Sequence, residues 1–268
     1  MPMSNLEFAG LGSGSKGNAT VIRCGATSVL VDCGFSATEI EKRLARIELC
    51  PFDLNAVLLT HEHSDHSNGV ASACRRFNLP LYASWGTIAC LRERGANLAD
   101  IDIVTISGGQ HYDFGTFKAS PVLVPHDARE PLQFVFTNGQ SKLGILTDLG
   151  SITSHVLNRY KQCDALLLEF NHDEQMLRDG PYPAKLKARV AGNWGHLSNK
   201  QAGQLLAAVD HQGLQHLVIA HISEKNNEAT RVQNILDATL IGATQTVFAE
   251  QARGFDWLTV GSVEAATI

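Results

Sequence analysis

The chain lacks the features of a membrane-spanning or exported protein. No stretch of its 268 residues approaches the roughly 18–20 uninterrupted apolar residues that a membrane-spanning helix needs. Residues 1–10 contain no basic segment followed by an apolar one, which is how an export signal begins. These absences predict that the protein stays in the cytoplasm and has no membrane partner.

Paired cysteines and an excess of basic charge are also missing. The six cysteines form no Cys-x-x-Cys pair and have no regular spacing, which excludes a zinc knuckle and a disulfide framework. We expect them to be small buried apolar residues in a reducing compartment. The net charge of −5 disfavours a protein that coats nucleic acid by bulk electrostatics, so any phosphate site must be local.

The composition is that of an ordinary globular protein, with 44% hydrophobic and 18% charged residues. Apolar strands alternate with amphipathic helices, and no linker, charge block or repeat interrupts them. This pattern predicts one α/β domain over residues 1–268. The predicted strands span 6–11, 19–24, 28–31, 56–60, 79–83, 103–106, 117–124, 132–137, 143–147, 165–170 and 216–220. The predicted helices span 36–48, 68–77, 85–94, 152–160 and 198–209.

Histidine is abundant, with 11 residues, and its densest cluster directly follows the predicted strand 56–60. Imidazole and carboxylate together suit zinc, manganese or iron(II). The i, i+2 spacing of the cluster requires non-helical backbone, so we expect a loop between a strand and a helix. A merely solvated polar loop is disfavoured, because crowded rings without a metal would compete for protonation. The candidate ligands are His61, His63, Asp65 and His66.

Three further polar residues, His126, Asp148 and His221, stand at the ends of later predicted strands. Ligands in α/β folds gather at strand ends, so we expect these side chains to meet at one edge. Each has a structural alternative. His126 could be a buried ring bonded to a backbone carbonyl, Asp148 could cap a helix beginning near Ser151, and His221 could be a core residue.

The glycine-serine loop 12–18 offers backbone N–H groups, hydroxyls and a lysine that could form an anion-binding nest. It does not match a P-loop, and a plain hairpin turn is the alternative. Two polar residues beside His221 are also placed to reach a substrate. The candidate substrate-binding residues are Ser13, Ser15, Lys16, Asn18, Lys225 and Asn226.

A short basic stretch contains Lys185, Lys187 and Arg189, and Asn193 and Trp194 follow it. These side chains could grip a nucleic-acid backbone and stack a base. A solvated helix face explains the stretch equally well.

The motif H-x-H-x-D-H after the apolar strand resembles the signature of the metallo-β-lactamase superfamily. Five further motifs look like the YycJ/WalJ subfamily of bacterial hydrolases, and the resemblance extends over essentially the whole chain. It implies a four-layer αββα sandwich of two mixed sheets flanked by helices, with the active site at one edge. The motifs are G-S-G-S-K-G-N at 12–18, V-P-H-D at 124–127, T-D-L-G at 147–150, G-H-L-S-N at 195–199 and A-H-I-S-E-K-N-N at 220–227.

The resemblance implies a site for two divalent ions, zinc or manganese, with iron also suitable. One ion would be held by His61, His63 and His126, the second by Asp65, His66 and His221, and Asp148 would bridge both. Flavodiiron relatives usually carry Glu at the position of His63, so this residue favours a hydrolase over an oxygen reductase.

Two residues are expected to take part directly in the reaction. Asp65 counts as catalytic as well as a ligand. His196 stands where relatives such as tRNase Z have a histidine thought to protonate the leaving oxygen, so the resemblance implies a general acid. The alternative is a loop histidine that orients Asp148 or caps the helix after Ser198.

We therefore expect a dinuclear-metal-dependent hydrolase. Two ions lower the pKa of a bridging water and supply hydroxide at neutral pH. The resemblance implies a phosphodiesterase, a 5′-to-3′ exonuclease that acts on DNA. One alternative is a small-molecule phosphodiesterase or thioester hydrolase of the same fold. Another is a metal-binding accessory or regulatory protein without significant turnover. The sequence leaves open whether the protein forms a homodimer.

Overall fold

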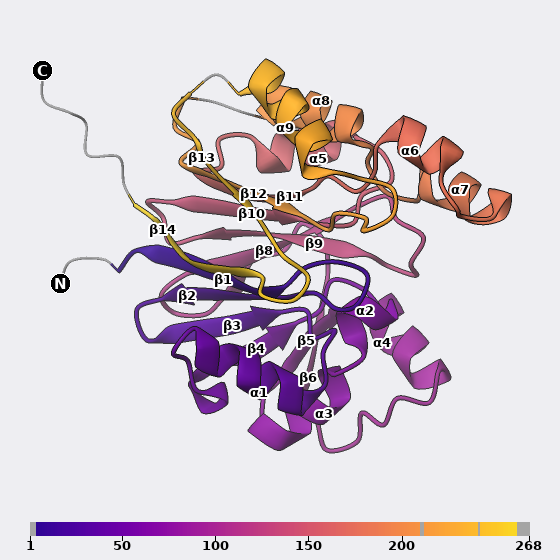
Figure 1. Cartoon of the computed structure of the whole chain (residues 1–268). Coiled ribbons are helices and arrows are strands. Elements are labelled where there is room, and N and C mark those ends of the chain that lie inside the picture. The colour runs from indigo at the N-terminus through magenta and orange to yellow at the C-terminus, as the bar shows by residue number, and fades with distance from the viewer. Residues whose placement is uncertain (1–3, 210–211, 241, 262–268) are drawn as a thin grey trace, which may run out of the picture.

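Two seven-stranded β-sheets face each other in the computed structural model, which describes residues 4–209, 212–240 and 242–261 (Figure 1). The first sheet contains, in spatial order, β14 (Phe255–Val260), β1 (Leu6–Gly12), β2 (Ala19–Cys24), β3 (Thr27–Val31), β4 (Ala56–Leu58), β5 (Leu81–Ser84) and β6 (Ile103–Ile106). The second contains β13 (Gln245–Phe248), β12 (His216–Ala220), β11 (Ala165–Glu169), β10 (Lys142–Leu146), β9 (Leu132–Thr137), β8 (Lys118–Leu123) and β7 (Tyr112–Asp113).

Both sheets are mixed in the same way. In the first, β1, β2 and β3 form an antiparallel meander, and β3 to β6 run parallel. In the second, β7 to β10 are antiparallel, and β10 to β13 run parallel. The strand β14 leaves the second half of the chain and pairs antiparallel with β1. The parallel strands therefore supply each sheet with a row of carboxyl ends.

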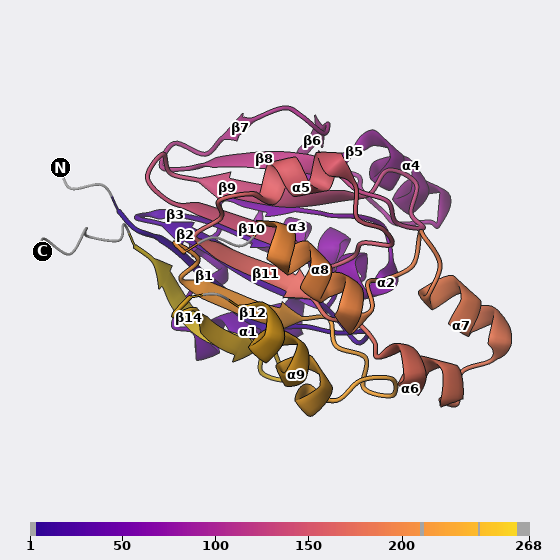
Figure 2. The same ribbon diagram turned by 90° about the horizontal axis from the view of Figure 1, so that it is seen from above.

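Helices cover the outer faces of both sheets, which makes the arrangement the predicted four-layer α/β sandwich (Figures 1 and 2). The helices on the side of the first sheet are α1 (Ala37–Arg46), α3 (Val70–Phe77) and α4 (Trp85–Glu93). Those on the side of the second are α5 (Ser154–Tyr160), α8 (Asn199–Val209) and α9 (Ala229–Thr239). The remaining helices lie toward one end of the sandwich: α2 (Ser64–Ser67), α6 (Glu174–Asp179) and α7 (Ala184–Val190).

The core between the sheets consists of aromatic and aliphatic side chains from both of them. Phe8 of β1 and Phe134 of β9 are fully buried in the same cluster. One further apolar cluster lies under the helices of each outer layer, and the helix α1 shows how such a cluster forms. Its cap Ser36 accepts a hydrogen bond from Glu39 N, and its apolar stripe buries Ile40 and Leu44. Both sheets therefore share one apolar core, and the single domain over residues 1–268 stays a prediction.

The predicted strands and helices are all present, with ends that differ by a few residues. The elements α2, α6, α9, β7, β13 and β14 were not predicted, and α7 was considered only as a solvated helix face. The strands β13 and β14 lie at sheet edges and are half-exposed, so their apolar pattern is weak. All six cysteines are free. The expectation that they are buried is wrong for Cys50, which precedes a surface 3-10 turn at Pro51–Asp53, and for the partly exposed Cys90.

The described residues contain no helix with the length and apolar character to cross a membrane.

We expect Phe134→Ala to lower the free energy of unfolding by about 3–5 kcal/mol, because it leaves a cavity between the two sheets. The matched control is Phe52→Ala, whose side chain is 70% exposed and should cost less than about 1 kcal/mol. Urea denaturation at a fixed metal concentration measures both, since metal binding itself shifts stability. Equal losses in the two variants would contradict an inter-sheet core at Phe134.

Candidate metal centre

The carboxyl ends of the parallel strands, together with the end of β8, bring every predicted metal ligand to one place. The segment 61–66 follows β4, and His126 follows β8. Asp148 follows β10 and His221 follows β12. All the predicted ligands belong to groups whose ligand atoms lie within 4.8 Å of one another. The expectation that these polar clusters meet at one edge is confirmed.

Three imidazole nitrogens converge in the first group. His61 Nε2 lies 3.0 Å from His63 Nδ1, and His126 Nε2 lies 3.2 Å from the same atom. Ligand nitrogens of a tetrahedral zinc ion, with bonds of about 2.0–2.1 Å, stand about 3.3 Å apart. The three rings are therefore close to the spacing that one ion imposes.

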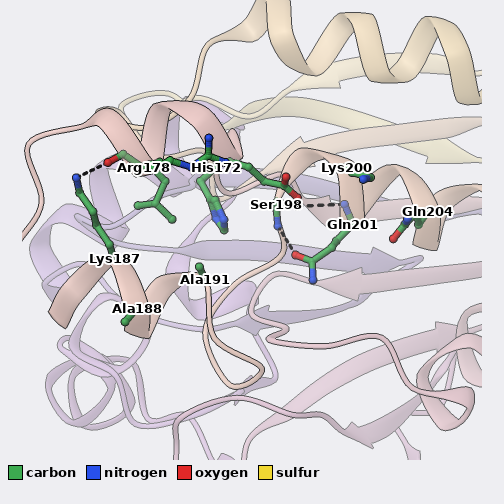
Figure 3. Close-up of a pocket in the computed structure, with 11 residues that line it drawn as sticks. His172, Arg178, Lys187, Ala188, Ala191, Ser198, Lys200, Gln201 and Gln204 are labelled. Carbon is green, nitrogen blue, oxygen red and sulfur yellow. Dashed lines mark hydrogen bonds between the residues drawn. The ribbon is translucent and has the colours of Figure 1, made fainter. Parts of the chain in front are cut away.

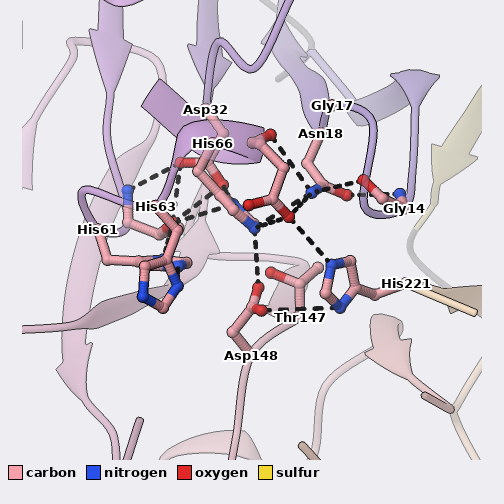
Figure 4. A network of polar contacts seen from close by, with 12 residues as sticks. Gly14, Gly17, Asn18, Asp32, His61, His63, His66, Thr147, Asp148 and His221 are labelled. Carbon is pink, nitrogen blue, oxygen red and sulfur yellow. Dashed lines mark hydrogen bonds and ion pairs between the residues drawn. The ribbon is translucent and has the colours of Figure 1, made fainter. Parts of the chain in front are cut away.

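The second group combines one carboxylate with two rings. Asp65 Oδ2 lies 3.4 Å from both His66 Nε2 and His221 Nε2. Asp148 Oδ2 lies 3.2 Å from His66 Nε2 (Figure 4). Its Oδ1 lies 3.8 Å from His126 Nε2 of the first group, so Asp148 stands between the groups. It does not cap a helix, because Thr153 caps α5.

The backbone of the segment 61–66 is only partly the predicted loop. His61 and His63 lie on non-helical backbone, but Asp65 and His66 belong to the one-turn helix α2, which begins after His63. The turn carries Asp65 and His66 toward the second group. The alternation argument thus holds for the first two histidines and is wrong for the other two ligands.

A buried acid that the sequence reasoning missed orients the ligands of both groups. Asp32 Oδ2 lies 2.7 Å from His66 Nδ1, and Asp32 Oδ1 accepts hydrogen bonds from Thr60 N and Oγ1. Because the Thr60 hydroxyl donates to Asp32, its oxygen accepts from His61 Nδ1 at 3.0 Å. Both rings are thereby left with Nε2 toward the ligand cluster. Asp32 adopts φ 62°, a strained conformation for a residue other than glycine.

His126 and His221 are held by backbone contacts. His126 Nδ1 lies 3.0 Å from the carbonyl oxygen of Gly195, so the carbonyl contact considered as an alternative exists and leaves Nε2 for a metal. His221 adopts φ 53°. Its backbone N donates to Ser13 Oγ at 2.8 Å, and its carbonyl accepts from Asn171 Nδ2 at 3.1 Å. These bonds stabilise the strained backbone at the ligand.

A second missed acid, Glu169, ends β11 and is fully buried. It accepts hydrogen bonds from Leu149 N at 2.6 Å and Leu197 N at 3.3 Å, and its Oε2 lies 3.1 Å from His196 Nδ1. His196 Nδ1 also lies 3.5 Å from Asp148 Oδ1. His196 does not cap α8, because Ser198 Oγ accepts from Gln201 N.

The loop 12–18 is not a free anion-binding nest. Gly14 N donates to Asn18 Oδ1, Lys16 N to Gln251 Oε1, and Asn18 N to the carbonyl oxygen of Asp65. Asn18 is buried, and its amide lies 3.3 Å from Asp65 Oδ2. The loop therefore holds the predicted ligand Asp65 in place through Asn18. A surface cleft beside the ligand groups, which we call the metal cleft, is lined by His63, Asp65, Asp148 and His221 among others. Ser15 is the member of the loop that lines it.

The other candidate substrate residues, Lys16, Lys225 and Asn226, do not line this cleft themselves. Lys16 is exposed and forms an ion pair with Glu224 at 2.8 Å. Lys225 Nζ lies 5.9 Å from the ring centroid of Tyr182, which itself lines the cleft. Asn226 is 1% exposed and does not line the cleft.

The metal cleft has a volume of about 360 Å³ and includes two guanidinium groups. Arg189 of α7 pairs with Asp127, and Arg94 donates to the carbonyl oxygen of Glu62 at 2.9 Å. Sequence reasoning singled out Arg189 but not Arg94. Trp194 is exposed and lines a separate groove.

Burial and charge divide the histidines into two classes. Burial lowers the pKa of His61, His63 and His126, so these rings are neutral at pH 7. Burial acts in the same direction on His66 and His221, but facing carboxylates, Asp148 foremost, outweigh it. They raise the pKa of His66 well above its usual value and that of His221 to about 10. Conversely, although burial favours their protonated forms, the rings lower the pKa of Asp65 and Asp148.

The residues present fit divalent metal ions. Asp148 Oδ2 is buried and accepts no hydrogen bond from the described residues, although it forms an ion pair with His66 Nε2 at 3.2 Å. Converging ring nitrogens beside a buried carboxylate oxygen that lacks a hydrogen bond are a donor set for a cation, and nitrogen and carboxylate ligands suit zinc, manganese and iron.

Two facing mixed sheets, helical outer layers and a His/Asp cluster at the ends of the parallel strands define the metallo-β-lactamase fold. Residues 27–222 match the model of the family described as a beta-lactamase superfamily domain, and the chain belongs to this superfamily. It is a metal-dependent hydrolase of that fold.

Two named relatives are similar over most of the chain. Exodeoxyribonuclease YycJ of Bacillus anthracis is 34% identical over 222 residues, which cover 83% of this chain and 84% of the relative. Exodeoxyribonuclease WalJ of Streptococcus pneumoniae is 32% identical over 224 residues, or 82% and 83% of the two chains. Among solved structures, the metallo-beta-lactamase fold protein YhfI from Bacillus subtilis has a TM-score of 0.72 at 16% identity, covering 96% of this chain and 99% of its own. The resemblance to the YycJ/WalJ subfamily is confirmed.

Metal binding should release protons. His66 and His221 carry protons at pH 7 in the metal-free protein because their pKa values are raised, whereas a metal binds the neutral ring. We expect about two protons released per loaded chain at pH 7. The apparent metal affinity should increase as the pH rises toward 10, the approximate pKa of His221.

Calorimetric titration in buffers of different ionisation enthalpy measures the proton count. His221→Ala should release one proton fewer, and the control His155→Ala, an exposed histidine outside every ligand group, should match the unmodified protein. A binding heat that does not depend on the buffer would contradict this protonation pattern.

Proposed function

We propose that the protein is a phosphodiesterase that removes nucleotides from DNA in the 5′-to-3′ direction and that it uses two divalent ions, zinc or manganese. The convergence of the seven predicted ligands in two adjoining groups carries the proposal. The names of its relatives, which are exodeoxyribonucleases, support DNA as the substrate. Cytoplasmic location and homodimer formation stay predictions from the sequence.

The ligand sets of the two ions follow from the two groups. His61, His63 and His126 would hold one ion and Asp65, His66 and His221 the other, with Asp148 shared. When bound, two such ions would lower the pKa of a water molecule toward 7 and would offset negative charge on the phosphoryl oxygens. Asp65 would then serve the reaction as a ligand of the second ion.

His196 lies where it can act as a general acid that donates a proton to the leaving oxygen. Its Nδ1 faces Glu169 Oε2, which fixes the ring, and its Nε2 has no partner among the described residues. The ring is 18% exposed and lines the cleft. When water adds to phosphorus and the bond to the leaving oxygen breaks, the Nε2 proton can neutralise that oxygen. Glu169 is a positioning residue in this step.

The cleft also contains positive charge for the substrate phosphates. Arg94 and Arg189 both line it, and guanidinium groups bind phosphate oxygens through paired hydrogen bonds. An acidic protein can in this way hold a polyanion at one place. Of the predicted loop residues, Ser15 and Lys16 are exposed at the rim, whereas Ser13 and Asn18 act through His221 and Asp65.

The test is hydrolysis of duplex DNA labelled at the 5′ or the 3′ end, with manganese or zinc. We expect early release of the 5′ label and progressive shortening of the 3′-labelled strand. His63→Ala and Asp148→Ala should lower the rate more than about a hundredfold, because several kcal/mol of charge stabilisation depends on the ions. His155→Ala should keep the rate of the unmodified protein.

Two other outcomes would overturn the proposal. Retained hydrolysis of a small phosphodiester or thioester without DNA cleavage would identify a small-molecule hydrolase. Absence of turnover on all these substrates, with partner binding that Asp148→Ala leaves unchanged, would identify a regulator.

The role of His196 predicts a dependence on the leaving group. His196→Ala should slow DNA hydrolysis by about 10²- to 10⁴-fold, because the departing sugar oxygen needs a proton. Hydrolysis of bis(p-nitrophenyl) phosphate, whose leaving group departs as a stable anion, should fall far less. Metal content measured by mass spectrometry should not change. Equal losses on both substrates, with loss of metal, would make His196 a ligand instead.

A further inference from the structure

Helix α7 stands between two hollows of the molecular surface. One set of its residues lines the metal cleft, and another set, continued by Ala191, lines a second groove of about 600 Å³. At 3.6 residues per turn the two sets are centred about 150° apart around the helix axis, so they occupy opposite faces. The set in the cleft is Leu186, Arg189 and Val190, and the set in the groove is Lys187, Ala188 and Ala191.

The α7–α8 groove, as we call this second hollow, is bounded by α6, α7 and α8 (Figure 3). Its lining residues include three cations, Arg178, Lys187 and Lys200. Glu174 also lines it, and its carboxylate accepts a hydrogen bond from Ser198 Oγ at 3.1 Å. The groove is therefore locally positive in a chain whose net charge is −5.

The position of the Lys187 ammonium is fixed by the fold. Its Nζ donates to the carbonyl oxygen of Arg178 at 2.6 Å, which joins α7 to α6 at the rim of the groove (Figure 3). An ammonium has three donors, so the group keeps N–H bonds for an anion.

His172 also lines the α7–α8 groove (Figure 3). Its Nδ1 lies 3.4 Å from Asn171 Oδ1, an acceptor, and burial lowers the pKa of the ring. The neutral ring therefore presents Nε2 as an acceptor, which does not bind a phosphate oxygen directly. The groups of the groove that can bind phosphate are its cationic side chains.

The two hollows are neighbours beneath the helix. Asn171 lines the metal cleft, and His172, the next residue, lines the α7–α8 groove. Helix α7 buries none of its own side chains, so it forms a ridge that separates the two hollows. Lys185 is exposed on this ridge.

A double helix matches this arrangement. An α-helix with its side chains is about 10–12 Å wide, and the major groove of B-DNA is about 12 Å wide. We propose that α7 lies between the two phosphate backbones of a duplex, with the hydrolysed strand in the metal cleft and the opposite strand in the α7–α8 groove. This inference rests on the proposed nuclease function and adds where the opposite strand of a duplex binds.

The chemistry of the groove accounts for recognition without sequence preference. Lysine and arginine side chains that contact phosphates position a duplex but do not read its bases. The groove face of α7 adds only small side chains, Ala188 and Ala191, beside Lys187. Opposite-strand binding would therefore favour duplex over single-stranded substrate at any sequence.

The test compares the salt dependence of binding for a duplex and for a single strand of the same sequence. The test variant is Lys187→Ala/Lys200→Ala, and the control is Lys42→Ala/Lys118→Ala, two exposed lysines outside both hollows. Phosphorothioate-protected DNA and the metal-loaded protein allow fluorescence anisotropy without hydrolysis. Each lost phosphate contact lowers the slope of log K against log salt by about 0.9.

We expect the test variant to lower the duplex slope by about 2 and to leave the single-strand slope unchanged. Its ratio of duplex to single-strand hydrolysis should fall about tenfold at moderate salt, and the control should keep the original ratio. Equal changes for both DNA forms, or no change for either, would overturn the inference. An unmodified protein that neither binds nor cleaves either DNA would instead refute the proposed function.

Discussion

The site depends on the balance between burial and opposite charge. Imidazole rings and carboxylates that are nearly excluded from water would each favour the neutral form if they stood alone. Placed together, Asp148 and Asp65 keep their negative charge because His66 and His221 face them, and these rings keep their protons for the same reason. A divalent cation replaces those protons with a charge of the same sign. In the absence of metal, the protonated rings and the ionised carboxylates offset the cost of burying one another, so this polar cluster can be buried.

The ligand positions and most of the sheets were predictable from local patterns. Short continuous apolar runs mark the strands, and the polar residues that follow them mark the edge where ligands gather. The supporting residues were not found, although a single acid at the end of an apolar strand was a usable signal for both Asp32 and Glu169. The loop 12–18 shows a different limit. The acceptor of Lys16 N is Gln251, 235 residues away, so no local pattern could show that the loop faces inward.

The strained residues at the site explain why its elements begin and end where they do. Asp32 and His221 both adopt left-handed backbone conformations directly after strands β3 and β12. Each turn redirects a side chain from the sheet toward the ligand cluster, and each is stabilised by hydrogen bonds from a distant segment. Such conformations cost about 1–3 kcal/mol each and persist only where the surroundings enforce them. The position of the ligands is thus enforced by contacts between distant segments, within the first half of the chain for Asp32 and between the two halves for His221.

The strand β14 joins the two halves of the chain, and its late position in the sequence affects when the first sheet can be completed. It is the last described strand, yet it pairs with the first, with Leu6 opposite Val260. It thereby forms one edge of the first sheet, and the segment 61–66 follows an inner strand of the same sheet. During synthesis the chain must wait for residues near 260 before the first sheet has its full set of strands. Contacts of such long sequence separation form slowly. A chain synthesised as far as His221 contains every predicted metal ligand but still has an incomplete first sheet, so this fold is complete only after β14 has been made.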